Sequence, residues 1–171
     1  MAALAADLAR APRPAVLIDG PSGAGKTTLA RRLGAVWPGP IALVSLDDVY
    51  PGWDGLAAGA AAVPGLLGDP SPGYRRWDWQ RGRPAEWVAL DPGAPIIVEG
   101  CGALTPASRA RASFGIWVDA DPAARRRRAL SRDGDAYAPH WDRWAAQERA
   151  HWAAHRPWEL ADLHLNSEAV G

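Results

Sequence analysis

The segment that most constrains the fold is IDGPSGAGKTTLARRL, at residues 18–33. Its residues 20–27 match the pattern G-x-x-x-x-G-K-[ST] in full: Gly20, Pro21, Ser22, Gly23, Ala24, Gly25, Lys26 and Thr27. An apolar run at 15–19 predicts a buried strand before the turn, and a helical pattern over about 26–36 follows it. A glycine-rich turn between a strand and a helix presents backbone N–H groups and the positive end of the helix to an anion. The sequence therefore predicts a phosphate-binding loop within an α/β fold.

Lys26 is the only lysine in the chain, and the other 18 basic residues are arginines. A lysine ammonium is a compact charge on a slim stem, which suits contact with the β- and γ-phosphates, whereas a guanidinium is broad and planar. The Thr27 hydroxyl is expected to bind Mg²⁺. We therefore predict that residues 20–28, including Thr28, bind the triphosphate of ATP together with Mg²⁺.

Further apolar runs at 41–45, 95–100, 115–120 and 162–166 alternate with helical patterns over about 122–131 and 141–155. This alternation predicts a three-layer α/β/α P-loop NTPase fold with about five parallel strands. We expect a single domain over 1–171, with a phosphate-binding core at 14–50, an acceptor-side insertion at 51–92 and a lid at 121–140. The insertion is dense in Gly, Pro and Trp and predicts no regular element beyond a helix near 55–67. Residues 132–140 are expected to form a loop at the tip of the lid.

The overall composition restricts the partners and the cell compartment that can be expected. Nineteen basic residues balance 19 acidic ones, so the charge predicts neither nucleic acid nor a membrane surface as a partner. One cysteine excludes an internal disulfide and fits a reducing compartment. No apolar run approaches the roughly 20 residues that cross a bilayer. We expect a cytoplasmic protein that acts on small molecules, and the sequence leaves a homo-oligomer open.

Three classes of P-loop protein compete for this sequence. A guanine-nucleotide switch needs an N-K-x-D or T-K-x-D motif and hence a second lysine, which the chain lacks. A motor ATPase usually has an apolar strand ending in Asp or Asp-Glu and further coupled domains, whereas here IIVEG ends in Glu99-Gly100. A compact small-molecule kinase fits best. Asp47 and Asp48 follow the second predicted strand, at the edge where α/β sheets bind ligands, and an aspartate there can orient and deprotonate an acceptor hydroxyl.

The segments GPSGAGKTT, LDDVY, RRWDW, IIVEG and WVDAD, followed by an arginine-rich helix, occur in the order found in uridine kinases. The chain resembles that family over roughly residues 14–166. The resemblance implies that Asp47 is the base and a sugar-hydroxyl ligand, that Trp77, Asp78 and Trp79 line the nucleoside, and that Glu99 helps to hold Mg²⁺. Tryptophans stand where uridine kinases have smaller aromatics and a histidine, and the chain is shorter than a typical member.

Other side chains complete the expected site. Tyr50 and Trp53 are assigned to the acceptor pocket, where a tryptophan face can stack on a planar ring. On a helix, Arg125, Arg128 and Arg132 share one face. We expect Arg125 and Arg128 to bind ATP, and Arg128 and Arg132 to act in catalysis with Lys26 and Asp47.

Three further groups of residues allow alternative interpretations. A stripe of residues on the predicted helix at 141–155 is interpreted as packing: Trp141, Trp144, Glu148, His151, Trp152 and His155. Cys101, directly after Glu99-Gly100, is either close to the active site or simple filler. Arg75, Arg76, Arg81 and Arg83 could recognise an anionic acceptor or be solvated loop charges.

These features predict a kinase that transfers the γ-phosphate of ATP to a hydroxyl of a small acceptor, with a nucleoside as the first candidate. Two alternatives share most of the same residues. One is a kinase for another acceptor, such as a nucleoside monophosphate, a sugar, a vitamin or an antibiotic. The other is a non-catalytic sensor that binds ATP.

Overall fold

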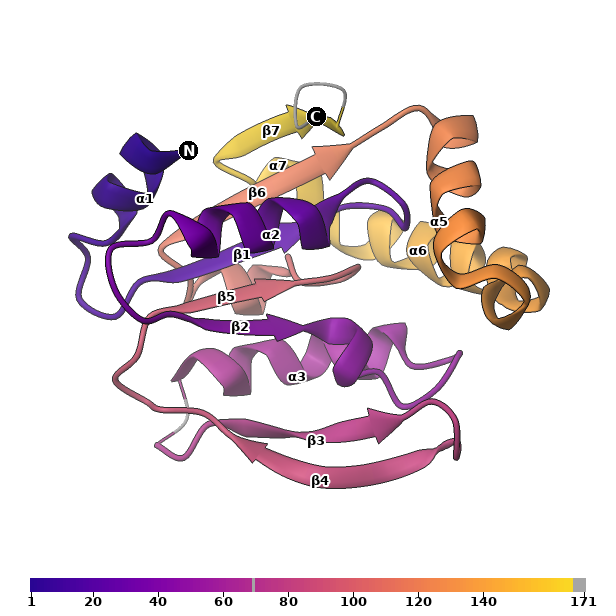
Figure 1. Cartoon of the computed structure of the whole chain (residues 1–171), viewed down its shortest axis with the longest axis horizontal. Helices are drawn as coiled ribbons and strands as arrows, with labels where there is room; N and C mark the ends of the chain where they lie inside the picture. Colours follow the sequence, from indigo (N-terminus) through magenta and orange to yellow (C-terminus); the bar gives the residue numbers. More distant parts are fainter. Residues whose placement is uncertain (69, 168–171) are drawn as a thin grey trace.

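A computed structural model describes residues 1–68 and 70–167 of the chain, and its centre is a five-stranded parallel sheet (Figure 1). The strands lie in the order β2-β5-β1-β6-β7. Their bounds are Ala15–Asp19 (β1), Ala42–Ser45 (β2), Ile96–Glu99 (β5), Phe114–Asp119 (β6) and Leu163–Asn166 (β7). All five residues of the central β1 are buried, as a continuous apolar run in a doubly covered parallel sheet requires. The five predicted strands are confirmed.

Helices cover both faces of the sheet. On one face, α1 (Ala2–Leu8) and α2 (Lys26–Ala35) pack on buried side chains of β1, β5 and β6, such as Ile18 and Val118. On the other face α3 (Leu56–Gly68) and α6 (Trp141–His155) pack on Leu17 and Val98, and the short α4 (Pro106–Arg109) lies beside α3. The predicted three-layer α/β/α fold is confirmed. In the described part of the chain, no helix is both long enough and apolar enough to span a membrane.

The parallel register brings the carboxyl ends of the strands together at one edge. Ser45 of β2 and Ile18 of β1 both lie opposite Glu99 of β5, and Asp19 of β1 lies opposite Trp117 of β6. In Figure 1 all the sheet's arrowheads point toward the end of the molecule where α5 (Pro122–Tyr137) lies. A ligand site is expected at this edge.

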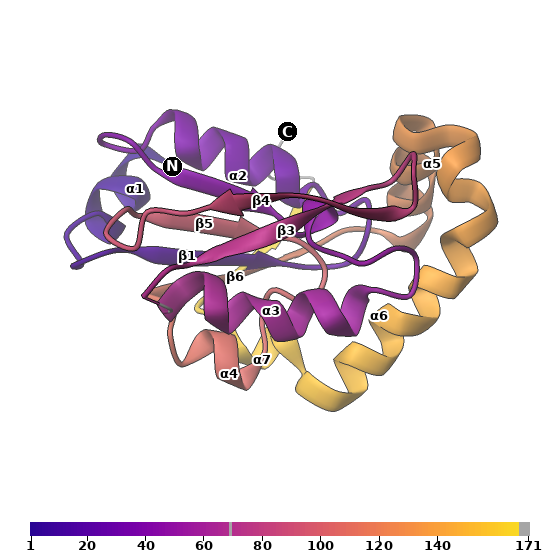
Figure 2. The same ribbon diagram turned by 90° about the horizontal axis from the view of Figure 1, so that it is seen from below.

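The segment between α3 and β5 differs from the prediction. The helix expected near 55–67 is present as α3, but an antiparallel hairpin of β3 (Gly73–Asp78) and β4 (Arg83–Ala89) follows it. Figure 2 shows the hairpin running alongside α3, and β3 also contacts the 3-10 turn η1 (Leu46–Asp48). The expectation of no further regular element in 51–92 was wrong. Both strands remain largely exposed or half-exposed, so they lack the apolar alternation that reveals a strand in sequence.

The lid also differs in part from the prediction. Its helix was expected to end near residue 131 and to continue as a loop, but α5 extends to Tyr137 and leads into a second 3-10 turn, η2 (Ala138–His140). Gly134 has non-helical backbone angles and kinks α5. The helix expected over 141–155 is confirmed as α6, and the short α7 (Pro157–Leu160) precedes β7.

Candidate active site

The loop between β1 and α2 passes so close to its neighbours that two of its glycines cannot be replaced. Gly20 has φ +151°, and a Cβ there would lie 2.0 Å from the carbonyl oxygen of Val118. Gly23 has φ +77°, and a Cβ there would lie 2.2 Å from the carbonyl oxygen of Arg125. Because only glycine fits at these two positions, the backbone can form the tight turn that ends at the N-terminus of α2.

Lys26, in the first turn of α2, points back into this loop. Its Nζ donates to the carbonyl oxygens of Gly20 at 2.7 Å and Pro21 at 3.0 Å, and it lies 3.4 Å from the Cys101 sulfur. Burial alone would lower the pKa of the ammonium, but the carboxylates around it, among them Glu99, Glu148 and Asp19, raise that pKa. Lys26 is therefore held as a cation at the phosphate-binding loop.

Asp19 lies fully buried beneath the loop and joins it to the segment after β5. Its carboxylate accepts backbone N–H groups from Gly20 at 2.6 Å, Gly102 at 3.0 Å and Leu104 at 2.8 Å. Burial raises its pKa to about 6, although these three hydrogen bonds and Lys26 act in the opposite direction. His151 Nε2 lies 3.9 Å from the carboxylate, and burial lowers the pKa of His151 to about 4. The sequence analysis gave no role to Asp19.

A second buried carboxylate, Glu148 of α6, reaches the loop from the opposite side. Its Oε1 accepts the Ser22 N–H at 2.7 Å and the Cys101 thiol at 3.3 Å. Burial raises the pKa of the thiol to about 12, so the thiol keeps its proton and can donate. The stripe on α6 was predicted to be packing. For Glu148 the structure shows a contact with the phosphate-binding loop instead, and helical spacing alone could not have distinguished the two.

The two residues predicted to bind Mg²⁺, Thr27 and Glu99, lie next to each other. Thr27 Oγ1 donates to Glu99 Oε1 at 3.0 Å, and Ser45 Oγ donates to the same oxygen at 2.7 Å. Among the residues that the structure describes, no group of three or more His, Cys, Asp or Glu side chains could form a metal cage. Mg²⁺ usually binds through one or two protein oxygens with phosphates and water, and this pair of oxygens fits that pattern.

Asp47 lies where two cavities meet. A cavity of about 80 Å³ is bordered by the phosphate-binding loop, Asp47, Glu99 and Arg132. A larger one of about 850 Å³ is bordered by Asp47, Arg132 and the first turn of α2, with Trp53 and Trp79 on its wall. A carboxylate shared by a phosphate-sized space and a larger space can contact both the transferred group and its acceptor.

The aromatic residues of the insertion form a stack with the lid. The Trp53 ring stacks on Tyr137, with centroids 5.3 Å apart, and on His140 at 4.4 Å. Trp79 lies 4.7 Å from Trp53, and its Nε1 donates to the Asp47 carbonyl at 2.7 Å. Buried Tyr50 donates its hydroxyl to the Cys101 carbonyl at 2.7 Å. Side chains of the segments 51–92 and 121–140 thus contact one another beside Asp47.

Two of the residues predicted to line the acceptor, Trp77 and Asp78, lie apart from this centre. Within the described residues, neither lines the two cavities above or a third cavity of about 70 Å³ that Asp47 also borders: Trp77 packs beside Gly52, and Asp78 accepts N–H groups of the hairpin turn. Arg125 donates to the Ser22 carbonyl at 3.3 Å, and Arg128 donates to Ser167 at 2.6 Å.

The four arginines of the hairpin lie at its exposed or half-exposed positions. Arg76 pairs with Glu86, and Arg81 pairs with Asp78. Arg75 donates to the Ala85 carbonyl. None of the four lines a cavity that Asp47 lines, as far as the described residues show.

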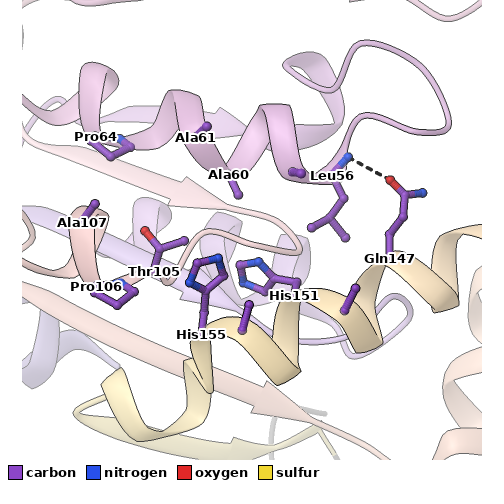
Figure 3. A pocket seen from close by; sticks show the side chains of 13 residues that line it. Leu56, Ala60, Ala61, Pro64, Thr105, Pro106, Ala107, Gln147, His151 and His155 are labelled. Atoms are coloured by element: carbon purple, nitrogen blue, oxygen red, sulfur yellow. Dashed lines mark hydrogen bonds between the residues drawn. The ribbon is translucent and has the colours of Figure 1, made fainter.

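A separate cavity of about 690 Å³ lies between α3, α4 and α6 (Figure 3). Its walls are mostly Ala, Leu and Pro side chains, with His151 and His155 on the α6 side. At its end Gln147 accepts the Leu56 N–H at 3.3 Å and donates to the Trp53 carbonyl at 2.7 Å. Among the described residues, none of the phosphate-binding loop lines this cavity, whereas α6 lines the cavity and also contacts the loop through Glu148.

No protein-family model and no curated protein matches the chain. Solved structures do match. A possible uridine kinase from Bacillus stearothermophilus has 18% identity and a TM-score of 0.64, with 95% of each chain covered. A candidate fructose transport system kinase from Silicibacter sp. TM1040 has 22% identity and a TM-score of 0.64, with 95% of this chain and 97% of that chain covered. An uncharacterized protein from Eubacterium ventriosum has 13% identity and a TM-score of 0.51 over 92% of each chain. The chain therefore shares its three-layer fold with these solved structures.

Proposed function

We propose that the chain is a phosphotransferase that moves the γ-phosphate of ATP to a hydroxyl of a small acceptor, with a nucleoside as the first candidate. The observation that carries this proposal is the position of Asp47. It borders both the small cavity at the phosphate-binding loop and the larger cavity walled by Trp53 and Trp79. A non-catalytic ATP sensor has no need for a carboxylate between two such spaces.

The roles follow from the chemistry of phosphoryl transfer, in which positioning and charge stabilisation dominate. Lys26 and the loop amides bind the β- and γ-phosphates. Asp47 orients the acceptor hydroxyl and accepts its proton. Arg132, which borders both cavities, offsets negative charge on the phosphates.

Thr27 and Glu99 supply oxygens for Mg²⁺, which neutralises phosphate charge when bound. Trp53 and Trp79 offer flat faces to a planar acceptor. Tyr50, Arg125 and Arg128 are proposed as supporting contacts beside this centre. In the described part of the chain, Trp77 and Asp78 lie outside the cavities that Asp47 borders, so no contact with the acceptor is proposed for them. Two of the neighbours in fold are described as kinases of a nucleoside and of a sugar transport system, which supports a small hydroxyl acceptor.

The test is ADP production by the purified protein with Mg-ATP and a panel of nucleosides, nucleoside monophosphates and sugars. We expect ADP release that depends on one class of acceptor. Asp47→Asn should lower kcat by about 10²- to 10⁴-fold while leaving ATP affinity unchanged, because only proton transfer and acceptor orientation are lost. Asp7→Asn, on exposed α1, is the matched control. ATP binding without acceptor-dependent ADP release from any compound would favour a sensor, and normal turnover by Asp47→Asn would exclude Asp47 as the base.

A further inference from the structure

Helix α6 contacts the candidate active site at several points along its length. Gln147 holds Trp53 and the start of α3 by two hydrogen bonds, one of which is drawn in Figure 3. One residue further, Glu148 turns toward the phosphate-binding loop and is only 3% exposed. A carboxylate this deeply buried is costly unless hydrogen bonds compensate it. The hydrogen-bond partners of Glu148 therefore indicate what this side chain does.

Those partners are parts of the phosphate-binding machinery. Glu148 Oε1 accepts the Ser22 N–H at 2.7 Å, within the loop itself. The same oxygen accepts the Cys101 thiol at 3.3 Å, and the Cys101 sulfur lies 3.4 Å from Lys26 Nζ. A continuous path of polar contacts thus runs from Lys26 through Cys101 and Glu148 to Ser22.

The Ser22 peptide units are consequently fixed from two helices. Glu148 of α6 holds the N–H, and Arg125 of α5 donates to the carbonyl at 3.3 Å. The next residue, Gly23, packs directly on the α5 backbone. A loop whose first turn is fixed in this way loses less conformational freedom when it closes on phosphates, so more of the interaction energy appears as affinity.

We propose that Glu148 is a positioning residue of the nucleotide site, which holds the Ser22 turn in its phosphate-binding conformation by accepting the Ser22 N–H. This inference rests on the proposed function, because it assigns Glu148 a role in binding ATP. The role belongs to the acceptor oxygen and does not require the negative charge. A glutamine offers the same oxygen at the same position, whereas a methionine fills the same space without it.

The experiment compares Glu148→Gln with Glu148→Met by ATP titration calorimetry, thermal unfolding and steady-state kinetics. Glu148→Gln should bind ATP within about threefold of wild type. Glu148→Met should bind ATP about tenfold or more weakly, because the Ser22 N–H loses its partner. Its Tm should fall as well, because a buried N–H without an acceptor is costly, but the loss of ATP affinity should persist at temperatures well below Tm, where the variant is fully folded. KM for ATP should rise more than kcat falls. Glu159→Gln and Glu159→Met, on an exposed glutamate of α7, are the matched controls.

Each other outcome overturns the inference. Wild-type affinity in Glu148→Met would show that the Ser22 contact does not position the loop. Equal weakening in both variants would assign the effect to the charge. If the ATP affinity of Glu148→Met falls only to the extent that the variant unfolds, Glu148 is a purely structural residue. Wild-type protein that binds no ATP would instead refute the proposed function, so the two failures can be told apart.

Discussion

The buried Asp19 carboxylate makes the stability of the protein depend on pH in an unusual direction. Most acids in a folded protein have lowered pKa values and stabilise it as pH rises. The half-buried Asp78 and the exposed Glu86 follow that pattern through hydrogen bonds to Arg81 and Arg76 respectively. The pKa of Asp19 is instead raised, because burial outweighs its three N–H donors. Its contribution to the free energy of unfolding is therefore greatest below its unfolded pKa and is lost as pH rises through its folded pKa.

The size of this effect follows from the two pKa values. Asp19 titrates at 3.8 in the unfolded chain and at about 6 in the folded one, which corresponds to roughly 3 kcal/mol between the extremes of pH. Between pH 8 and pH 5 the wild type should gain about 1.4 kcal/mol from this residue. The neighbouring His151 acts in the opposite direction over this range, because burial lowers its pKa from 6.5 to about 4 and the unfolded imidazole takes up a proton that the folded one does not. This contribution is common to the wild type and to a variant of Asp19, so it cancels in the difference between them.

Asp19→Asn removes this titration and leaves every other group in place. The assay is urea unfolding of both proteins at several values between pH 8 and pH 5, and the quantity of interest is the difference in unfolding free energy between wild type and variant. Asparagine cannot accept all three N–H groups, so the variant is less stable than the wild type by an amount that does not depend on pH. The difference should still shift by about 1.4 kcal/mol in favour of the wild type toward pH 5. A flat difference, or a shift toward the variant, would refute the reasoning that burial dominates.

Two further substitutions test the loop itself. Gly23→Ala should cost more than the roughly 1–2 kcal/mol of a left-handed backbone, because its Cβ would strike the Arg125 backbone, and it should weaken ATP binding. Gly82→Ala is the control, because Gly82 has φ +60° and a Cβ there would meet no atom within 4 Å, so this variant shows the backbone cost alone. Urea unfolding measures both variants, and equal losses of unfolding free energy at the two positions would contradict the packing argument. Lys26→Ala should weaken ATP binding by about 10- to 100-fold in calorimetry, and unchanged affinity would count against the phosphate cradle.

The sheet and the loop were predictable because their signals are local. A buried parallel strand such as β1 is an apolar run, and the glycine pattern fixes the turn that follows it. The order of the strands was not predicted. It depends on how each crossover packs, and no single segment encodes that.

The hairpin and the end of the lid show where local patterns mislead. Trp87 is 52% exposed on β4, and a strand that presents an indole to solvent has no polar alternation to recognise. Gly82, which has a left-handed φ, lies at the turn just before β4. At the lid, the helix was expected to end near residue 131, but α5 continues through a kink at Gly134.

Within the candidate site, the loop residues could be proposed from the sequence because their pattern is made by neighbours along the chain. Asp19 and Glu148 were missed for a different reason. Their partners are 83 and 126 positions away, at Gly102 and Ser22. A glutamate on a helix is a solvated charge in most sequences, and only the docking angle of α6 makes this one a hydrogen-bond acceptor for the phosphate-binding loop.

The structure also explains why an arginine-rich chain keeps one lysine. Lys26 Nζ has three acceptors around it: two loop carbonyls and the Cys101 sulfur. An ammonium has three donors on one atom and can satisfy all of them, whereas a guanidinium carries five N–H groups in a plane and would bury some without partners. The residue is only 8% exposed, so solvent could not supply the missing acceptors. Because these bonds are made to the loop itself, phosphates can compete for the same ammonium without any rearrangement of the surrounding sheet.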